Sequence, residues 1–140
     1  MNDIIDTHAF GRGALSFALA FVDAGGFALI FKALYQFITP HNEGKLIREG
    51  NVAAALALGG ALVGYVLPLA SALSNTVTLL EFCAWAALAG VLQIAAFTLV
   101  RMVVMKDVAA RIEKGEVAAG VYLLSISLAV GVLNAACMTA

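Results

Sequence analysis

The sequence predicts an all-α integral membrane protein, a four-transmembrane-helix bundle built from two tandem helix hairpins. Of the 140 residues, 63% are apolar and only 12% are charged, about half the charged share that covers the surface of a water-soluble domain. Four apolar stretches reach the length of about 20 residues that a helix needs to cross a bilayer core of about 30 Å. Part of the sequence also recurs at a fixed offset.

The four predicted spans lie near residues 14–38, 52–74, 82–104 and 117–139. They occupy most of the chain, so we expect residues 1–140 to form a single transmembrane domain without a separate aqueous catalytic domain. The connections between them are short, and sequential helices joined in this way pack as antiparallel neighbours. The predicted fold is therefore a bundle whose main solvent is the lipid bilayer.

Basic residues predict how the chain is oriented. They gather in the two longer linkers, whereas the turn near 75–81 and the carboxyl end contain no Lys or Arg. Lys and Arg are concentrated in cytoplasmic loops, and helical spans belong to the bacterial inner membrane because outer-membrane proteins are barrels. We therefore expect a multi-pass inner-membrane protein with both linkers in the cytoplasm and both termini in the periplasm. The linker residues are Lys45, Arg48, Lys106, Arg111 and Lys114.

A repeated segment predicts that the chain consists of two equivalent halves. Residues 47–55 read IREGNVAAA, and residues 112–120, which lie 65 positions later, read IEKGEVAAG. Two spans per unit return the chain to the same side of the membrane, so repeats over 14–74 and 82–139 share one orientation and are related by an axis along the membrane normal. Chance similarity between two alanine-rich helices is the alternative.

The cytoplasmic linkers end with signals for a helix start. Asn51 is a plausible N-cap for the second span, and Glu116 places a negative charge at the positive end of the last helix. The stretch 106–114 has the spacing of a short amphipathic turn on the inner leaflet. A plain solvated loop is the interpretation that we favour.

Small residues predict where the spanning helices pack closely. Lipid tails are as apolar as leucine, so helices associate in the bilayer through small residues and interhelical hydrogen bonds. Gly60 and Gly64 form a GxxxG pair in the second span, and Gly90 belongs to a small-xxx-small pair in the third. Asn134, near the outer end of the last span, is expected to bond across helices. These four residues are the candidate packing positions.

Polar residues within the predicted spans form a candidate intramembrane cluster. At a rise of about 1.5 Å per residue, Asp23 and Tyr65 reach roughly the middle of the bilayer, and Gln93 and Ser127 come within a turn of that level. An ionised carboxylate at that depth is normally paired, protonated or facing water. The cluster is either a proton- or cation-responsive site or a structural link between helices, and the second interpretation is slightly favoured.

No pattern in the sequence indicates catalysis or a cofactor. His8 and His41 lack ligand spacing to Cys, Asp or Glu, so no metal site is predicted, and no phosphate-binding loop or nucleophile elbow is present. A formal charge of −1 gives no basic face for a nucleic acid. Cys83 and Cys137 are interpreted as buried thiols rather than as a periplasmic disulfide. We expect the protein not to be an enzyme.

Several of these segments resemble a known bacterial family. They are 47–55, Gly64 with 68–70, 112–119, and the terminal stretch GVLNAACMT over 131–139. Together they resemble domain-of-unknown-function family 350, which includes the YjfL-like inner-membrane proteins. The resemblance covers nearly the whole chain and implies a four-span inner-membrane protein with a membrane partner in an envelope-stress type system. It brings no catalytic or binding residues with it.

Two functional hypotheses follow. In the first, the protein is a small inner-membrane subunit that forms homo-oligomers and anchors or recruits cytoplasmic partners. Its linker residues Arg48, Arg111 and Lys114 are then the candidate contacts. In the second, the protein is an oligomeric channel or transporter for ions or small cations, with Asp23 in the path. Four tightly packed helices offer no evident aqueous lining, so such a path would lie between subunits.

Overall fold

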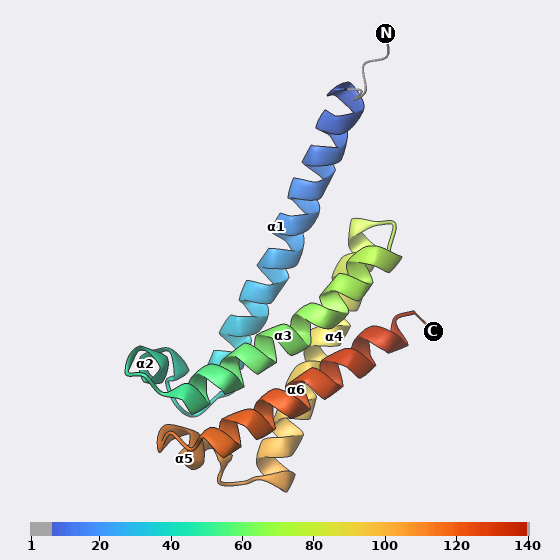
Figure 1. The fold of residues 1–140 in the computed structure, drawn as a ribbon. Helices are drawn as coiled ribbons and strands as arrows, with labels where there is room; N and C mark the ends of the chain where they lie inside the picture. Colours follow the sequence, from blue (N-terminus) through green and yellow to red (C-terminus); the bar gives the residue numbers. More distant parts are fainter. Residues whose placement is uncertain (1–6, 140) are drawn as a thin grey trace.

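The computed structural model describes residues 7–139, which form helices and their connections (Figure 1). Four long helices are joined in sequence, with a short helix in each of the two longer linkers. The elements are α1 (Thr7–Ile38), α2 (Glu43–Arg48), α3 (Val52–Asn75), α4 (Leu79–Leu99), the π-helical turn η1 (Val100–Val104), α5 (Val108–Glu113) and α6 (Val117–Cys137).

The four predicted spans are confirmed as helices that are long and apolar enough to cross a membrane. These helices are α1, α3, α4 continued by η1, and α6. The last three agree with the predicted ranges within three residues at each end. The first helix begins at Thr7 instead of residue 14. Polar residues such as His8 and Arg12 mark the limit of the apolar stretch there, but they do not prevent the helix from continuing.

A close pairing of α3 with α6 forms the centre of the molecule. Both helices start at the end where α2 and α5 lie, so they run parallel. Buried alanines and glycines line their contact. Helix α4 packs against both α3 and α6, while α1 packs against α3 and α4 through the half that ends at Ile38.

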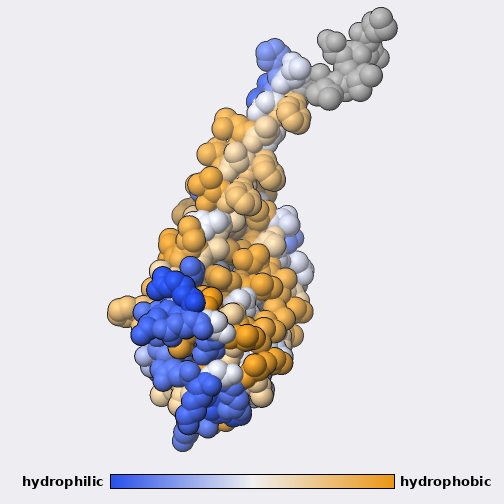
Figure 2. Space-filling model, turned by 60° about the vertical axis from the view of Figure 1, so that its left-hand side comes forward, coloured by the Kyte–Doolittle hydropathy of each residue, from blue (hydrophilic) through white to orange (hydrophobic). Residues whose placement is uncertain are grey.

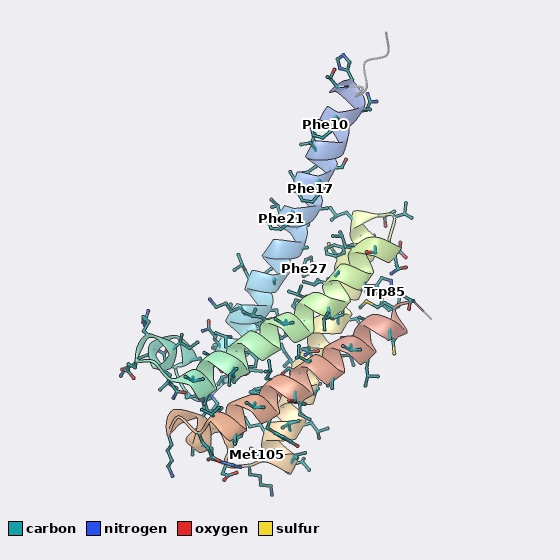
Figure 3. The ribbon with its side chains drawn as sticks, in the orientation of Figure 1. Phe10, Phe17, Phe21, Phe27, Trp85 and Met105 are labelled. Atoms are coloured by element: carbon teal, nitrogen blue, oxygen red, sulfur yellow. The ribbon has the colours of Figure 1, made fainter. Side chains whose placement is uncertain are left out.

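The amino-terminal half of α1 stands apart from this core (Figure 1). Phe10, Phe17 and Phe21 are 69%, 72% and 70% exposed, and Figure 3 shows them along the part of α1 that stands apart. Phe27 marks the change, because its ring meets that of Phe82 edge to face with the centroids 5.7 Å apart. The bundle is therefore compact around α3, α4 and α6, and α1 is attached by its second half.

The two ends of the molecule differ in polarity. The end that carries α2 and α5 is called here the linker end, and the end with the turn between α3 and α4 is called the far end. Hydrophilic residues gather at the linker end, and apolar residues cover the helices above it (Figure 2). Trp85 lies toward the far end and Met105 at the linker end (Figure 3). This is the charge distribution that the sequence predicts.

The short helix α5 corrects the expectation of a solvated loop over 106–114. In α5 the side chains of Val108 and Ile112 are buried, with exposures of 1% and 0%. Residues four apart lie on the same face of a helix. Burial of these two apolar groups therefore stabilises a helical turn that six residues would not form alone in water.

Candidate functional site

Three predicted polar residues tie the central helices together. The Tyr65 hydroxyl donates to the Ala86 carbonyl at 2.9 Å. The Gln93 amide donates to the Ser127 carbonyl at 2.8 Å, which joins α4 to α6. Because these donors bond to backbone carbonyls on neighbouring helices, the arrangement fits the structural link that the sequence analysis favoured.

Asn134 makes a similar link nearer the far end. Its amide donates to the Ala89 carbonyl at 3.2 Å and joins α6 to α4. In the same region Gly90 faces the ring of Tyr65, and a Cβ added to this glycine would lie 3.4 Å from the ring. The polar and small residues on α4 therefore belong to one contact surface.

Glycines allow α3 and α6 to approach at the level of the backbone. A Cβ added at Gly60 would lie 2.6 Å from the Leu124 Cα, and Cβ atoms at Gly64 and Gly131 would collide with the backbone of Ser127 and of Gly64 itself. Contact this close requires the absence of a side chain. The predicted packing positions Gly60 and Gly64 thus lie at the helix contact, and Gly131 is an additional one.

Asp23 does not join Tyr65, Gln93 and Ser127. It borders a small cavity at the far end together with Thr76, Thr78 and Phe82. The depth count assumed helices parallel to one another, but α1 crosses the bundle at an angle (Figure 1). Asp23 shares its cavity with Thr76 and Thr78 of the turn between α3 and α4. The predicted four-residue cluster is therefore divided between two places.

The two linkers follow the same backbone course. Glycines with positive φ, Gly50 at 87° and Gly115 at 77°, follow the two short helices. Each glycine donates to the carbonyl three residues before it, Gly50 to Ile47 and Gly115 to Ile112, at 3.0 Å and 2.9 Å. Glycine adopts such a φ without the strain that a Cβ introduces. The repeated Gly in the sequence therefore has a conformational cause in both linkers.

A side-chain hydrogen bond joins the linkers to each other. The Asn51 side chain accepts from the Ala54 amide at 2.9 Å and so caps α3, as the sequence predicts. Its NH₂ group donates to the Ile112 carbonyl of α5 at 2.7 Å. One residue therefore begins a spanning helix and connects the first linker to the second.

The three basic residues singled out in the sequence differ in their surroundings. Arg48 and Lys114 are exposed. Arg111 is held by Glu116, with its Nε donating to Oε2 at 2.7 Å. Hydrogen bonding to Glu116 raises the pKa of Arg111, and the same contact lowers the pKa of Glu116. Arg111 therefore shapes the second linker, and Arg48 and Lys114 present their charges to the surroundings.

A buried polar group in the first linker was missed by the sequence analysis. The side chains of His41 and Glu43 are 5% and 0% exposed, and His41 Nε2 lies 3.5 Å from Glu43 Oε1. Tyr35 of α1 contacts Glu43, and the Arg101 guanidinium of η1 donates to the Ile38 carbonyl at 2.7 Å. In the sequence, residues 39–51 look like a polar loop. One signal of burial at this position was available in the sequence: the residue 65 positions after Glu43 is the apolar Val108.

Metal-ligating side chains do not gather in the part of the chain that the structure describes. No group of three or more His, Cys, Asp or Glu residues is found between residues 7 and 139. Cys83 and Cys137 are both free thiols, one partly buried and one exposed.

Comparison with known proteins gives one family and two close relatives. The family model described as Domain of Unknown Function (DUF350) matches residues 9–138. The chain is 42% identical over 125 residues to the UPF0719 inner membrane protein YjfL of Escherichia coli strain K12. The match covers 89% of this chain and 94% of the relative, and the protein of the same name in Escherichia coli O157:H7 gives the same values. No solved structure matches.

Proposed function

The chain belongs to the DUF350 family, and on that premise we propose that it is a small inner-membrane subunit that forms oligomers and recruits a cytoplasmic partner to its linker end. The likeness to an inner membrane protein and the four apolar helices support a multi-pass protein of that membrane. The basic residues of both linkers support a cytoplasmic location for the linker end and a periplasmic one for both termini.

The observation that carries this proposal is the connection between the two linkers. The hydrogen bond from Asn51 to the Ile112 carbonyl and the matching glycine turns give both linkers one fixed arrangement. A surface that is ordered before binding loses less conformational entropy when a partner docks. The linker end is therefore suited to recognition, and the resemblance to a family linked with envelope stress indicates the type of system that supplies the partner.

The exposed half of α1 supports the proposed oligomer. With 32 residues, α1 is the longest helix of the chain. At about 1.5 Å per residue it exceeds a bilayer core of about 30 Å by more than half. The first half of α1 contributes nothing to the buried core, so this stretch is available to pack against a second copy of the chain.

The same linker geometry supports a proposal that the chain is a tandem repeat. Helices α2 and α5 have six residues each and begin 65 positions apart, at Glu43 and Val108. The amides of Asn51 and Glu116 bond to the carbonyls of Leu46 and Arg111 at 2.9 Å and 3.0 Å, again at that offset. Equal turns in the two linkers support a duplication over chance similarity of alanine-rich helices.

Site-specific crosslinking tests the recruitment. A photoreactive residue placed at Lys45, which is exposed at the linker end, is expected to capture a specific cytosolic protein in cells. The double variant Arg48→Gln with Lys114→Gln is expected to reduce that capture several-fold, since it removes two exposed positive charges. Arg12→Gln, which removes a positive charge on the exposed start of α1, serves as the matched control. Capture of no specific protein, or equal capture by all variants, would refute recruitment.

A channel is the second candidate, and one observation favours it. Asp23 borders a cavity together with the hydroxyl-bearing residues Thr76 and Thr78, and a carboxylate among hydroxyls is a setting in which a cation binds. The path would run between subunits because α3 and α6 touch at backbone level. Liposomes with the protein are expected to pass protons or monovalent cations, and Asp23→Asn is expected to slow that flux. Equal flux in protein-free liposomes would exclude the channel.

A further inference from the structure

A polar pocket lies at the linker end, where α1 passes into α2. Its volume is about 380 Å³, and five of its six lining residues have polar side chains. The lining residues are Gln36, Thr39, Pro40, His41, Asn42 and Glu43. The side chains of His41 and Glu43 are almost completely buried, with exposures of 5% and 0%. Polar groups that are buried in the wall of a pocket call for an explanation beyond packing.

The imidazole of His41 has no hydrogen-bond partner within the described chain. Both of its ring nitrogens are buried, and neither makes a hydrogen bond. Its Nε2 lies 3.5 Å from Glu43 Oε1, which is too long for a strong hydrogen bond. Two ligands that are held about 2.1 Å from one zinc ion in tetrahedral geometry are separated by about 3.4 Å. The separation of the two side chains therefore matches that of neighbouring ligands on one metal ion.

The carboxylate of Glu43 is held in place and keeps its charge. Tyr35 of α1 forms a side-chain hydrogen bond with it, and carboxylates that bind metal ions commonly have such a partner to fix their orientation. A carboxylate accepts about four hydrogen bonds, so one hydroxyl leaves it able to bind a cation. Among residues 7–139, no Lys or Arg nitrogen lies within 4.0 Å of this carboxylate. A bound cation would therefore compensate a charge that no basic side chain neutralises.

The second linker shows that the fold does not require a carboxylate at this position. Glu43 is the first residue of α2 and Val108 is the first residue of α5, and each is 1% exposed. The two short helices have equal length, and a glycine with positive φ follows each of them. An apolar side chain is therefore compatible with the course of the chain, and the carboxylate of Glu43 adds the capacity to bind a cation.

We propose that His41 and Glu43 bind a divalent transition-metal ion in this pocket, with Zn²⁺ as the best match. An imidazole nitrogen favours Zn²⁺ over Mg²⁺ and Ca²⁺, which prefer sites made of oxygen ligands alone. Two protein side chains leave the other coordination positions to water or to oxygen atoms of the pocket. The ion ties the start of α2 to the end of α1. This site goes beyond the proposed recruitment and does not depend on the identity of a cytoplasmic partner.

Equilibrium dialysis of the full-length protein, without an affinity tag and in detergent micelles, tests the binding. After removal of metals with a chelator, the protein is expected to bind one Zn²⁺ per chain at neutral pH. A tenfold excess of Mg²⁺ is expected not to displace it. Binding no greater than that of protein-free micelles, or displacement by Mg²⁺, would overturn the proposal.

Variants of the two side chains locate the ion. His41→Gln removes the imidazole and Glu43→Gln removes the carboxylate charge, and each is expected to raise the Kd for Zn²⁺ at least about tenfold, because even the loss of a residue that only orients a ligand costs about 10- to 100-fold. His8→Gln and Glu49→Gln replace an exposed histidine and an exposed glutamate outside the pocket. These controls are expected to keep the Kd of the natural protein. Equal affinity in all four variants would refute the site.

X-ray absorption at the zinc edge identifies the ligands without relying on any variant. The natural protein loaded with one Zn²⁺ is expected to show only nitrogen and oxygen ligands, including one imidazole. The free thiols of Cys83 and Cys137 are the competing ligands. A sulfur ligand in the spectrum, or the lack of an imidazole, would place the ion elsewhere and overturn the proposal even if Zn²⁺ binds tightly.

Discussion

The two linkers have the same backbone course and differ in what they bury and in how the next helix begins. Glu43 occupies in the first linker the place of Val108 in the second. Asn51 caps α3 with its side chain, whereas Glu116 makes no such cap on α6 and binds Arg111 instead. The shared features, a six-residue helix and a glycine turn, are sufficient for the course of the chain. A role other than folding is therefore expected at the residues in which the two linkers differ.

The largest effect is expected when a buried carboxylate, as in the first linker, is introduced at the matching position of the second linker. Val108→Glu places a carboxylate at a position that is 1% exposed and is occupied by an apolar side chain in the natural protein. An unpaired buried charge costs about 3 to 5 kcal/mol of stability. The expected result is a large fall in the midpoint of thermal unfolding, followed through the fluorescence of Trp85 in detergent.

The opposite exchange, Glu43→Val, is the matched control. Val108 fills the corresponding place in the second linker with the same exposure of 1%, so a valine is expected to fit at position 43 and to cost less stability than Val108→Glu. If both exchanges destabilise the protein equally, the two positions are not equivalent, and the argument that Glu43 is dispensable for folding fails.

The spans were predictable because each depends on a local property of the chain. A run of about 20 apolar residues forms a helix in lipid whatever its neighbours are, and the ends of α3, α4 and α6 follow from Asn51, the turn near 75–81 and Glu116. The burial of Glu43, by contrast, does not depend on a local property of the chain. It depends on where Tyr35 comes to lie, and this residue contacts Glu43 only after the helices have packed.

The candidate intramembrane cluster shows the same limit. The Gln93 amide reaches the Ser127 carbonyl because Gly64 has no side chain in the space between them, and that glycine is visible in the sequence as part of the GxxxG pair. Asp23 was placed by counting residues along α1, which carries no information on the angle between helices. The position of a residue along its own helix was therefore predictable, and the level at which α1 meets the other helices was not.

A second difference between the linkers lies at the helix starts. Asn51→Ala removes both the cap of α3 and the hydrogen bond to the Ile112 carbonyl. A lost cap costs about 1 kcal/mol and a lost hydrogen bond about the same. We expect a loss of about 2 kcal/mol in thermal or denaturant unfolding. The structural equivalent Glu116→Ala removes no cap, and a larger effect there would contradict the assignment of Asn51.

The glycine turns are the feature in which the linkers ought to respond alike. Gly50→Ala and Gly115→Ala each force a Cβ into a backbone with positive φ, at a cost of about 1 kcal/mol. No heavy atom lies within 4 Å of a Cβ added at either position, so strain in the backbone is the whole cause. Equal shifts in the unfolding midpoint are expected. A clear difference between the two variants would show that one turn contributes more to stability than the other.

The smallest expected effect concerns the ion pair of the second linker. Because Arg111 lowers the pKa of Glu116, the pair stabilises the fold at pH values above the ordinary range of a glutamate, and this contribution disappears as the pH falls through the lowered pKa. The difference in unfolding midpoint between the natural protein and Glu116→Gln is therefore expected to be small at neutral pH and to vanish in acid or in about 0.5 M salt. Glu49→Gln, which breaks the exposed 3.8 Å contact with Lys45 in the first linker, is expected to change even less, since that pair is longer and both side chains are more exposed. A salt-independent loss in Glu116→Gln would mean that the carboxylate supports α6 by a route other than Arg111.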